Sequence, residues 1–355
     1  MTDKEILGWL SEVRHPAYGD RSVVALGLVG DIETGDGGIK VTLSFGKRPD
    51  PLKNYLEGAV KAALYRHAPE GTRISVVSTV KKSEPAPQQP QFSFDLIDGV
   101  RHIIGIASGK GGVGKSTVAV NLAVALARLG FKTGLADADV YGPSVPIMTG
   151  TEGESPGAFG EEGKEVFLPV EKFGVKWMSI GYFAPPGQAL IWRGPMACSA
   201  LKQMILQVQW GDLDYLLVDM PPGTGDIHIS LVQDIPVEGA VIVTTPQDVA
   251  LADVEKGVDM FRNEKIDRRI FGIVENMSWF TPEDLPDRKY HIFGEGGGRR
   301  MAEKFGVPLL GQIPLVGSLC ENGDRGTPTA LGSGADALAF ISLASALDKA
   351  VSGTE

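Results

Sequence analysis

The segment that begins at Arg101 constrains the fold of this chain more than any other part of the sequence. An apolar run, Arg101–Ala107, leads to Gly109-Lys-Gly-Gly-Val-Gly-Lys-Ser116, and apolar residues at helical spacing follow. This order of strand, glycine-rich turn and helix fits the pattern G-x-x-x-x-G-K-[ST]. The glycines let backbone N–H groups point at phosphate oxygens, and the helix N-terminus adds partial positive charge. The segment therefore predicts a phosphate-binding loop in an α/β fold.

The last two residues of the pattern indicate the ligand. Lys115 is expected to reach the β- and γ-phosphates of ATP, and the Ser116 hydroxyl is expected to ligate Mg²⁺. The glycines also fit the dinucleotide pattern G-x-G-x-x-G, with Asp137 about 20 residues farther on. A dinucleotide fold needs no lysine here, whereas a triphosphate does, so ATP is favoured. The expected ATP-binding residues are Gly109, Lys110, Gly111, Gly112, Val113, Gly114, Lys115, Ser116, Thr117 and Asn276.

Acidic residues end two further strand candidates. Asp219 follows the apolar run Tyr215–Val218 and enters a segment rich in proline and glycine. A carboxylate at this end of a central strand is suited to hold Mg²⁺. Asp137 and Asp139 end a second candidate strand, where alternation would place both side chains on one face. We expect Asp137 and Asp219, with Ser116, to support Mg²⁺ and Asp139 to orient the attacking water.

Two other polar residues lie near these segments. Asn276 follows the apolar run Ile270–Val274, and its amide can pair with the edge of a base. His228 lies beside the loop after Asp219, and we expect it to be structural rather than catalytic. The five histidines are scattered and show no metal-ligand spacing.

Apolar strand candidates alternate with helical segments from residue 98 onward. Such alternation is typical of a parallel sheet covered on both faces. We expect a P-loop NTPase of the α/β class with a mostly parallel, doubly wound sheet in residues 98–355, ending in an apolar helix over 336–351. The strand candidates are Arg101–Ala107, Lys132–Ala136, Tyr215–Val218, Ala240–Thr244, Ile270–Val274 and Leu309–Ile313, and the helix candidates include Ser116–Leu129, Val249–Asn263 and Gly297–Phe305.

Residues 1–80 have the pattern of a separate small α/β domain. Helical spacing is found over Lys4–Val13 and Pro51–Arg66, and strand patterns are found over Arg21–Val29, Gly38–Phe45 and Arg73–Val80. Residues 81–91 contain proline and glutamine without a large apolar side chain, so they cannot pack a core. We therefore expect a linker over 81–97.

Composition excludes several classes of protein. A net charge of −10 disfavours broad nucleic-acid binding, which needs a basic face. The charged N-terminus has no apolar signal-peptide core, and no run approaches the roughly 18 apolar residues of a membrane span. Two cysteines make no disulfide framework. We expect a cytoplasmic protein that binds neither nucleic acid nor membrane.

A second lysine inside the glycine-rich turn, Lys110, resembles that of the deviant P-loop in the MinD/ParA/ArsA ATPases. In that group this lysine crosses a dimer interface and touches the partner's nucleotide. The resemblance implies a homodimer with nucleotide sandwiched between two subunits, and a catalytic role for Lys110 beside Lys115 and Asp139.

Further segments resemble one family within this group, the Mrp/ApbC-type iron–sulfur cluster carriers. They are Gly109–Thr117, Asp137–Ser144, Arg193–Met196, Asp219–Asp226, Thr245–Asp253, Val274–Ser278 and Ile292–Gly298. Residues 1–80 resemble the small domain often fused ahead of bacterial members. The resemblance implies an ATPase that binds Fe–S clusters and delivers them to apoproteins, with assembly factors or clients as partners. It also implies that Asn276 recognises adenine.

The chain departs from this family at the cluster site. Members carry Cys-x-x-Cys shortly after Asn-Met-Ser, whereas Trp279–Tyr290 contains no cysteine. The small domain often has a cysteine before its helix, where Asp50 stands here. Thiolates are the usual Fe–S ligands, and carboxylates are poorer ones. The ligands of a cluster stay unassigned: Cys198 and Cys320 could give four thiolates in a homodimer, or both could be small apolar residues.

Three hypotheses follow. The first is a dimeric, Mg²⁺-dependent ATPase that carries Fe–S clusters. The second is a nucleotide-gated protein-interaction switch that binds no cluster. The third is a MinD- or ParA-like positioning protein on membrane or DNA, which the acidic charge and the missing basic terminal helix disfavour.

Overall fold

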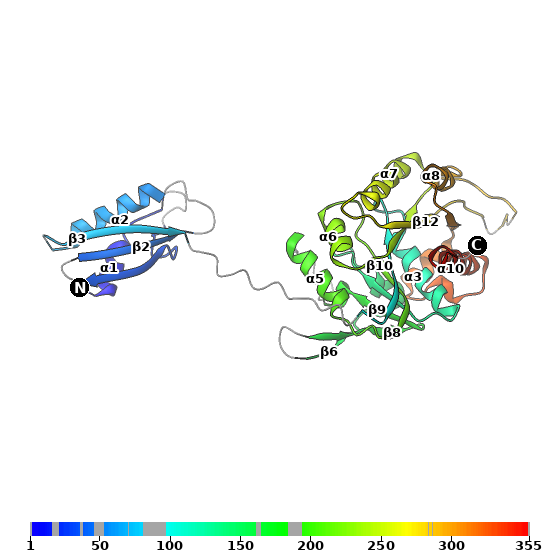
Figure 1. The fold of residues 1–355 in the computed structure, drawn as a ribbon, viewed down its shortest axis with the longest axis horizontal. Coiled ribbons are helices and arrows are strands. Elements are labelled where there is room, and N and C mark those ends of the chain that lie inside the picture. The colour runs from blue at the N-terminus through cyan, green and yellow to red at the C-terminus, as the bar shows by residue number, and fades with distance from the viewer. Residues whose placement is uncertain are drawn as a thin grey trace. The chain divides into compact units, whose positions relative to one another are not determined.

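The chain divides into two compact units, Met1–Gln91 and Phe92–Glu355, in the computed structural model (Figure 1). The structure describes residues 2–15, 21–35, 38–45, 53–69, 71–80, 97–160, 165–183, 194–282, 284–285 and 287–353. The predicted linker, apart from Ile97, lies outside these ranges, as does Asp50. No helix within them is long and apolar enough to cross a membrane.

The smaller unit is a three-stranded sheet with two helices. Its elements are α1 (Asp3–Leu10), β1 (Val29–Gly35), β2 (Gly38–Phe45), α2 (Lys53–His67) and β3 (Arg73–Val80). The strand order is β1-β2-β3, with β2 antiparallel to β1 and parallel to β3. Alternate residues of β2 are buried and pack with residues of both helices in one core. Period-two burial explains why this strand is visible in the sequence.

The predicted strand over Arg21–Val29 is wrong, because most of it forms turns. The Ser22 hydroxyl accepts a hydrogen bond from the Ala25 N–H at 3.1 Å, and Gly27 adopts a positive φ of 64°. Side-chain bonds to nearby backbone compete with sheet pairing. The strand β1 therefore starts only at Val29.

The larger unit is built on an eight-stranded sheet in the order β13-β12-β11-β4-β10-β5-β9-β8. All neighbouring pairs are parallel except β8–β9, which confirms the predicted fold class. The strands are β4 (Val100–Ala107), β5 (Thr133–Asp137), β8 (Val170–Lys172), β9 (Val175–Ser179), β10 (Leu213–Asp219), β11 (Gly239–Thr244), β12 (Arg269–Glu275) and β13 (Leu309–Gln312), and a separate pair is β6 (Gly157–Phe159) and β7 (Val166–Leu168).

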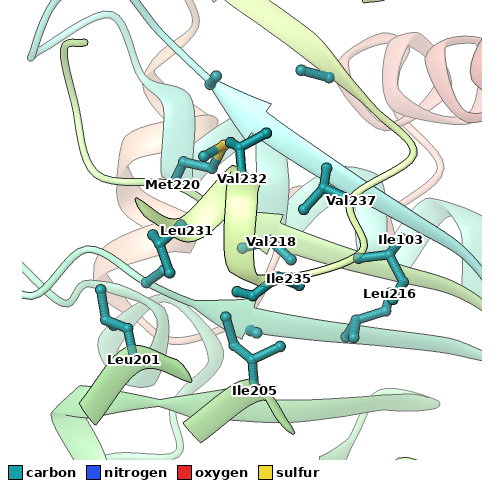
Figure 2. Packing of buried hydrophobic residues seen from close by; sticks show 14 of the residues in the cluster. Ile103, Leu201, Ile205, Leu216, Val218, Met220, Leu231, Val232, Ile235 and Val237 are labelled. Carbon is teal, nitrogen blue, oxygen red and sulfur yellow. The ribbon is translucent and has the colours of Figure 1, made fainter. Parts of the chain in front are cut away.

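Helices cover both faces of this sheet. They are α3 (Lys115–Arg128), α4 (Val145–Thr149), α5 (Gly194–Leu206), α6 (Asp226–Asp234), α7 (Asp248–Arg262), α8 (Gly297–Phe305), α9 (Gly317–Asp324) and α10 (Ala335–Ser352). One core joins the sheet to α3 and α10, and the other joins it to α5, α6, α7 and α8. Figure 2 shows the second core, where Leu201 of α5 and Leu231 of α6 lie near Val218 of β10.

The strand order changes direction at β4, which lies between β10 and β11. Ligands of open α/β sheets bind beyond the carboxyl ends of strands at such a point. The loop that follows β4 and the acids that end β5 and β10 therefore meet at one edge of the sheet.

Candidate nucleotide site

The glycines of the loop after β4 satisfy separate backbone requirements. Gly112 and Gly114 have positive φ angles of 82° and 81°, which side chains rarely adopt. A Cβ atom on Gly109 would lie 2.1 Å from the carbonyl oxygen of Asp253 in α7, and one on Gly114 would lie 2.3 Å from the amide nitrogen of Asn276. The loop is therefore packed against α7 on one side and the end of β12 on the other.

Lys115 is buried at the start of α3 and points at the strand-end acids. Its ammonium group donates to Asp219 Oδ1 at 2.5 Å and to the Ser116 hydroxyl at 3.2 Å. It also lies 3.9 Å from Asp139 Oδ2. The structure thus brings together four of the residues that the sequence predicts at the phosphates.

Asp137 and Asp219 are fully buried and stand opposite each other on the parallel strands β5 and β10. The Ser179 hydroxyl donates to Asp137 Oδ2 at 2.9 Å, and the Asp139 N–H donates to Asp137 Oδ1 at 3.1 Å. Burial raises the pKa of Asp137 to about 7, the Asp219 carboxylate adds to the rise, and Lys115 opposes it. Burial also raises the pKa of Asp219, against the lowering effect of Lys115.

This acid pair fits a divalent cation. Asp219 Oδ2 is buried and has no hydrogen-bond partner among the described residues. Two desolvated carboxylates beside a hydroxyl supply the hard oxygen ligands that Mg²⁺ prefers. The predicted set of Ser116, Asp137 and Asp219 is therefore chemically suited to the ion.

The prediction that Asp137 and Asp139 both end a strand, with their side chains on one face, is wrong. β5 ends at Asp137, and Asp139 lies in the loop beyond it. The Ala138 N–H donates to the Asp219 carbonyl oxygen at 2.9 Å, which continues the pairing of β5 with β10 one residue past Asp137. The Asp139 side chain is 14% exposed, whereas that of Asp219 is 0% exposed. Asp139 is thus near Lys115 and only partly exposed to solvent.

Lys110 differs from Lys115 in its surroundings. It is half-buried, and no hydrogen bond or ion pair of its ammonium group is found within the described part of the chain. Its carbonyl oxygen accepts from the Ser108 hydroxyl at 3.0 Å, and the Ser108 carbonyl accepts from the Gly223 N–H at 3.0 Å. These bonds join the loop after β4 to the loop after β10.

A cavity of about 380 Å³ opens beside the end of the loop. Its lining includes Gly114 and Thr117 at the phosphate end, Asn276, the segment Pro314–Val316, and residues of α4 and α9. Of these, the sequence predicts only Gly114, Thr117 and Asn276 as nucleotide-binding residues. The remainder come from loops and short helices that pattern and spacing do not connect.

Asn276 has one orientation fixed by hydrogen bonding. Its Nδ2 donates to the Val113 carbonyl oxygen at 2.9 Å, so its Oδ1 is the free acceptor. This Oδ1 is buried and has no partner among the described residues. Met277 follows with a positive φ of 55°, a strained conformation for this residue type.

Glu275 anchors this turn and was missed by the sequence analysis. Its carboxylate accepts from the Gly298 N–H at 2.5 Å and from Gln312 Nε2 at 2.7 Å. These bonds tie the end of β12 to the start of α8 and to β13. The glycines at the start of α8 were the available signal, because a Cβ on Gly298 would lie 2.8 Å from Glu275 Cβ.

His228 is buried in α6, and its Nε2 has no partner among the described residues. Burial lowers its pKa to about 4, and the positive charge of Lys115 contributes. The ring is therefore neutral, which fits the structural role that we predicted for it.

The two cysteines are both free thiols. Cys198 in α5 is half-buried, and Cys320 in α9 is exposed. In the ranges that the structure describes, no three histidine, cysteine, aspartate or glutamate side chains are grouped to hold a metal ion. Neither thiol thus belongs to a preformed metal site within these ranges.

Comparison with known proteins gives consistent results. Residues 99–347 match the family model of the ParA group described as NUBPL iron-transfer P-loop NTPase. An "Iron-sulfur cluster carrier protein" from Synechocystis sp. is 43% identical over 329 residues, which are 92% of this chain and 91% of the relative. A protein of the same name from Aquifex aeolicus is 48% identical over 268 residues, or 74% and 72% of the two chains.

A solved structure also resembles this chain. The nucleotide-binding protein from Archaeoglobus fulgidus in complex with ADP is 36% identical, with a TM-score of 0.59 over 69% of this chain and 93% of that one. The segment that matches the family model contains the loop after β4, the strand-end acids and Asn276. The chain is therefore a P-loop NTPase and belongs to the NUBPL iron-transfer family.

Proposed function

We propose that this protein is an ATPase that uses Mg²⁺ and carries iron–sulfur clusters to apoproteins in the cytoplasm. The observation that carries the nucleotide part is the meeting of Lys115 with Asp219, Asp137 and Ser116 beyond the ends of β4, β5 and β10. The names of the relatives from Synechocystis and Aquifex support the cluster part.

Each residue of the site has a part in hydrolysis. The N–H groups of Gly109–Thr117 cradle the phosphates, and Lys115 leaves Asp219 to neutralise phosphate charge. Ser116, Asp137 and Asp219 would hold Mg²⁺, which supplies charge neutralisation between the β- and γ-phosphates. Asp139 is exposed enough to meet a water molecule and orient it toward the γ-phosphate.

Asn276 selects the base. Its Oδ1 is a buried acceptor without a partner among the described residues, and one N–H of its Nδ2 is bound to the Val113 carbonyl oxygen. The 6-amino group of adenine is a donor, whereas the 6-oxo group of guanine is an acceptor. ATP is therefore favoured over GTP.

Lys110 completes the site of a second copy. Its ammonium group has no partner in the described residues and borders the phosphate loop. In a homodimer, each Lys110 would reach the nucleotide of the other copy. The phosphates of that nucleotide would then be the anionic partner of its ammonium group. The cluster is then cargo held with thiols of two copies or of an assembly or client protein, since Trp279–Tyr290 offers no cysteine.

The nucleotide part is tested by ATP turnover in the purified protein. Lys115→Ala is expected to abolish hydrolysis and to weaken ATP binding strongly, because phosphate charge is left unneutralised. Lys265→Ala, at an exposed site beyond α7, serves as the control. A folded Lys115→Ala protein that hydrolyses ATP normally would refute the assignment.

The cluster part is tested by anaerobic reconstitution with iron and sulfide, followed by iron counting per chain. We expect a labile cluster that depends on a partner's thiols, on small-molecule thiols, or on Cys198 and Cys320, and its loss from the Cys198→Ser/Cys320→Ser protein would assign it to these two cysteines. Absence of iron under every condition would favour the second candidate, a cluster-free interaction switch. The missing Cys-x-x-Cys after Asn276 is the observation that supports this candidate.

A further inference from the structure

The wall of the cavity beside the phosphate loop carries a thiol. Cys320 and Leu319 of α9 line this cavity, as do Gly114 and Thr117. The Cys320 side chain is exposed, and its Sγ donates to Asp324 Oδ2 at 3.8 Å. The other thiol, Cys198, belongs to α5 and is absent from the lining.

A second observation, an acceptor without a partner, points to a ligand in this cavity. Asn276 is 2% exposed and lines the same cavity, and its Oδ1 accepts no hydrogen bond in the described residues. A buried acceptor without a partner costs roughly 1–3 kcal/mol, which a donor on a ligand would recover. Leu315 and Val316 give the cavity an apolar wall suited to a flat ring.

The helix that carries the thiol is weakly held. None of the residues of α9 is buried, and its N-cap residue, Val316, makes no side-chain hydrogen bond. Gly317 and Gly323 lower its helical propensity further. An attached group at Cys320 can therefore be accommodated without disrupting a core.

We propose that Cys320 is a site of reversible thiol modification and that a group attached there excludes nucleotide from the cavity. This inference rests on the proposed function in assigning the base of ATP to the cavity. The cavity volume of about 380 Å³ leaves little room for a base and a peptide-sized adduct together. Thiol state and nucleotide occupancy are thereby linked in one pocket.

The chemistry is exchange with a low-molecular-weight disulfide. The Cys320 thiolate attacks one sulfur of the disulfide, a new S–S bond forms, and the old S–S bond breaks. The departing thiolate takes up the proton that Cys320 released. Cys320 is oxidised, one half of the disulfide is reduced, and a second thiol reverses the step.

Coupling between two sites is reciprocal. If the adduct lowers ATP affinity by some factor, ATP must disfavour formation of the adduct by the same factor. Two independent measurements can therefore be made on the same protein.

The test uses full-length protein with oxidised glutathione as the probe. Adduct formation is followed by intact mass spectrometry, and ATP binding is followed by calorimetry. The Cys198→Ser variant keeps Cys320 as its single thiol, and Cys320→Ser keeps only Cys198. In Cys198→Ser protein we expect the adduct to weaken ATP binding at least about tenfold, a reductant to restore it, and saturating ATP to lower the fraction of adduct at equilibrium with a fixed ratio of oxidised to reduced glutathione.

In the Cys320→Ser protein, treatment with oxidised glutathione is expected to leave ATP affinity where it was before treatment. Failure of Cys320 to form the adduct, or equal ATP affinity with and without it, would overturn the inference alone. Absence of ATP binding in untreated wild-type protein would instead overturn the proposed function, and the inference with it.

Discussion

At the scale of single residues, hydrogen-bond geometry decides which nucleotide fits. The amide of Asn276, a residue that lines the cavity, donates to the Val113 carbonyl oxygen, and its Oδ1 is left as a buried acceptor without a partner among the described residues. The same amide nitrogen lies where a side chain on Gly114 would clash. The base-binding residue and the phosphate loop are thus fitted to each other.

The first prediction concerns this amide. Asn276→Ala is expected to weaken ATP binding about tenfold and to reduce the preference for ATP over GTP, because one hydrogen bond to the base is lost. Competition of ATP and GTP for the site measures both effects. Asn263→Ala, an exposed asparagine after α7, should keep the wild-type preference. A variant at position 276 with full discrimination would show that another group reads the base.

A second prediction concerns His228, whose folded pKa of about 4 lies below its ordinary value of 6.5. Between these values the unfolded chain binds a proton that the folded chain does not, so stability falls as pH drops from 6.5 toward 4. The loss attributable to this ring is roughly 3 kcal/mol.

Thermal melting of wild type and His228→Gln from pH 7 to pH 4.5 tests this. Asp137, whose raised pKa acts in the opposite direction, is present in both proteins and so cancels in the comparison. Wild type should lose more stability on acidification than the variant. If the melting temperatures of the two proteins fell in parallel with pH, the His228 ring would already be accessible to protons in the folded protein.

Residues that act through a local pattern could be predicted from the sequence, and those brought together by the fold could not. Lys115 and Ser116 follow from spacing within eight positions, and Asp219 follows from its place at a strand end. Only the fold shows that Cys320 lines the cavity and that Glu275, which precedes Asn276 in the chain, is bonded to the start of α8. No spacing within the sequence predicts these contacts.

At the scale of elements, long buried strands and helices were predictable because a continuous apolar run must be buried, and in an α/β fold it is buried within a strand or a helix. β4, β10, β12 and α8 lie within a few residues of their predicted bounds. The β8–β9 hairpin was missed because its strands are short and its turn uses Phe173 with a positive φ of 57°. Gly174, the second residue of this turn, has a positive φ of 74° and was the one turn signal available there.

The packing of α7 against the phosphate loop gives a prediction at this scale. Gly109→Ala places a methyl group 2.1 Å from the Asp253 carbonyl oxygen, so α7 or the loop must move. We expect weaker ATP binding and a loss of roughly 1–3 kcal/mol of stability, as in overpacked cores. Calorimetry and thermal melting measure the two effects.

A matched control lies in the same helix. A Cβ on Gly257 of α7 meets no atom within 4 Å, so alanine fits there. Gly257→Ala should raise stability by roughly 0.5–1 kcal/mol, because alanine loses less backbone entropy in a helix. If both substitutions had the same effect, close approach would not be the reason for glycine at 109.

At the scale of the whole molecule, the division into units and the similarity to relatives agree. The similarity to the Synechocystis protein covers 92% of the chain, which is more than the larger unit contains, so it extends into the smaller one. The smaller unit has its own core of residues from α1, α2 and β2. The catalytic residues that we propose all belong to the larger unit.

The final prediction concerns association of two copies. Lys110 borders the phosphate loop, yet its ammonium group has no hydrogen bond or ion pair in the described part of the chain, whereas Lys115 is bound to Asp219. If Lys110 serves the nucleotide of a second copy, Lys110→Ala should keep ATP binding and lose hydrolysis or ATP-dependent association. Light scattering with and without ATP, beside turnover, separates these effects. Lys265→Ala is the matched control, because it removes an exposed lysine outside the loop. If Lys110→Ala protein hydrolysed ATP normally as a monomer, the homodimer with sandwiched nucleotide would be refuted. Catalysis would then need only a single chain.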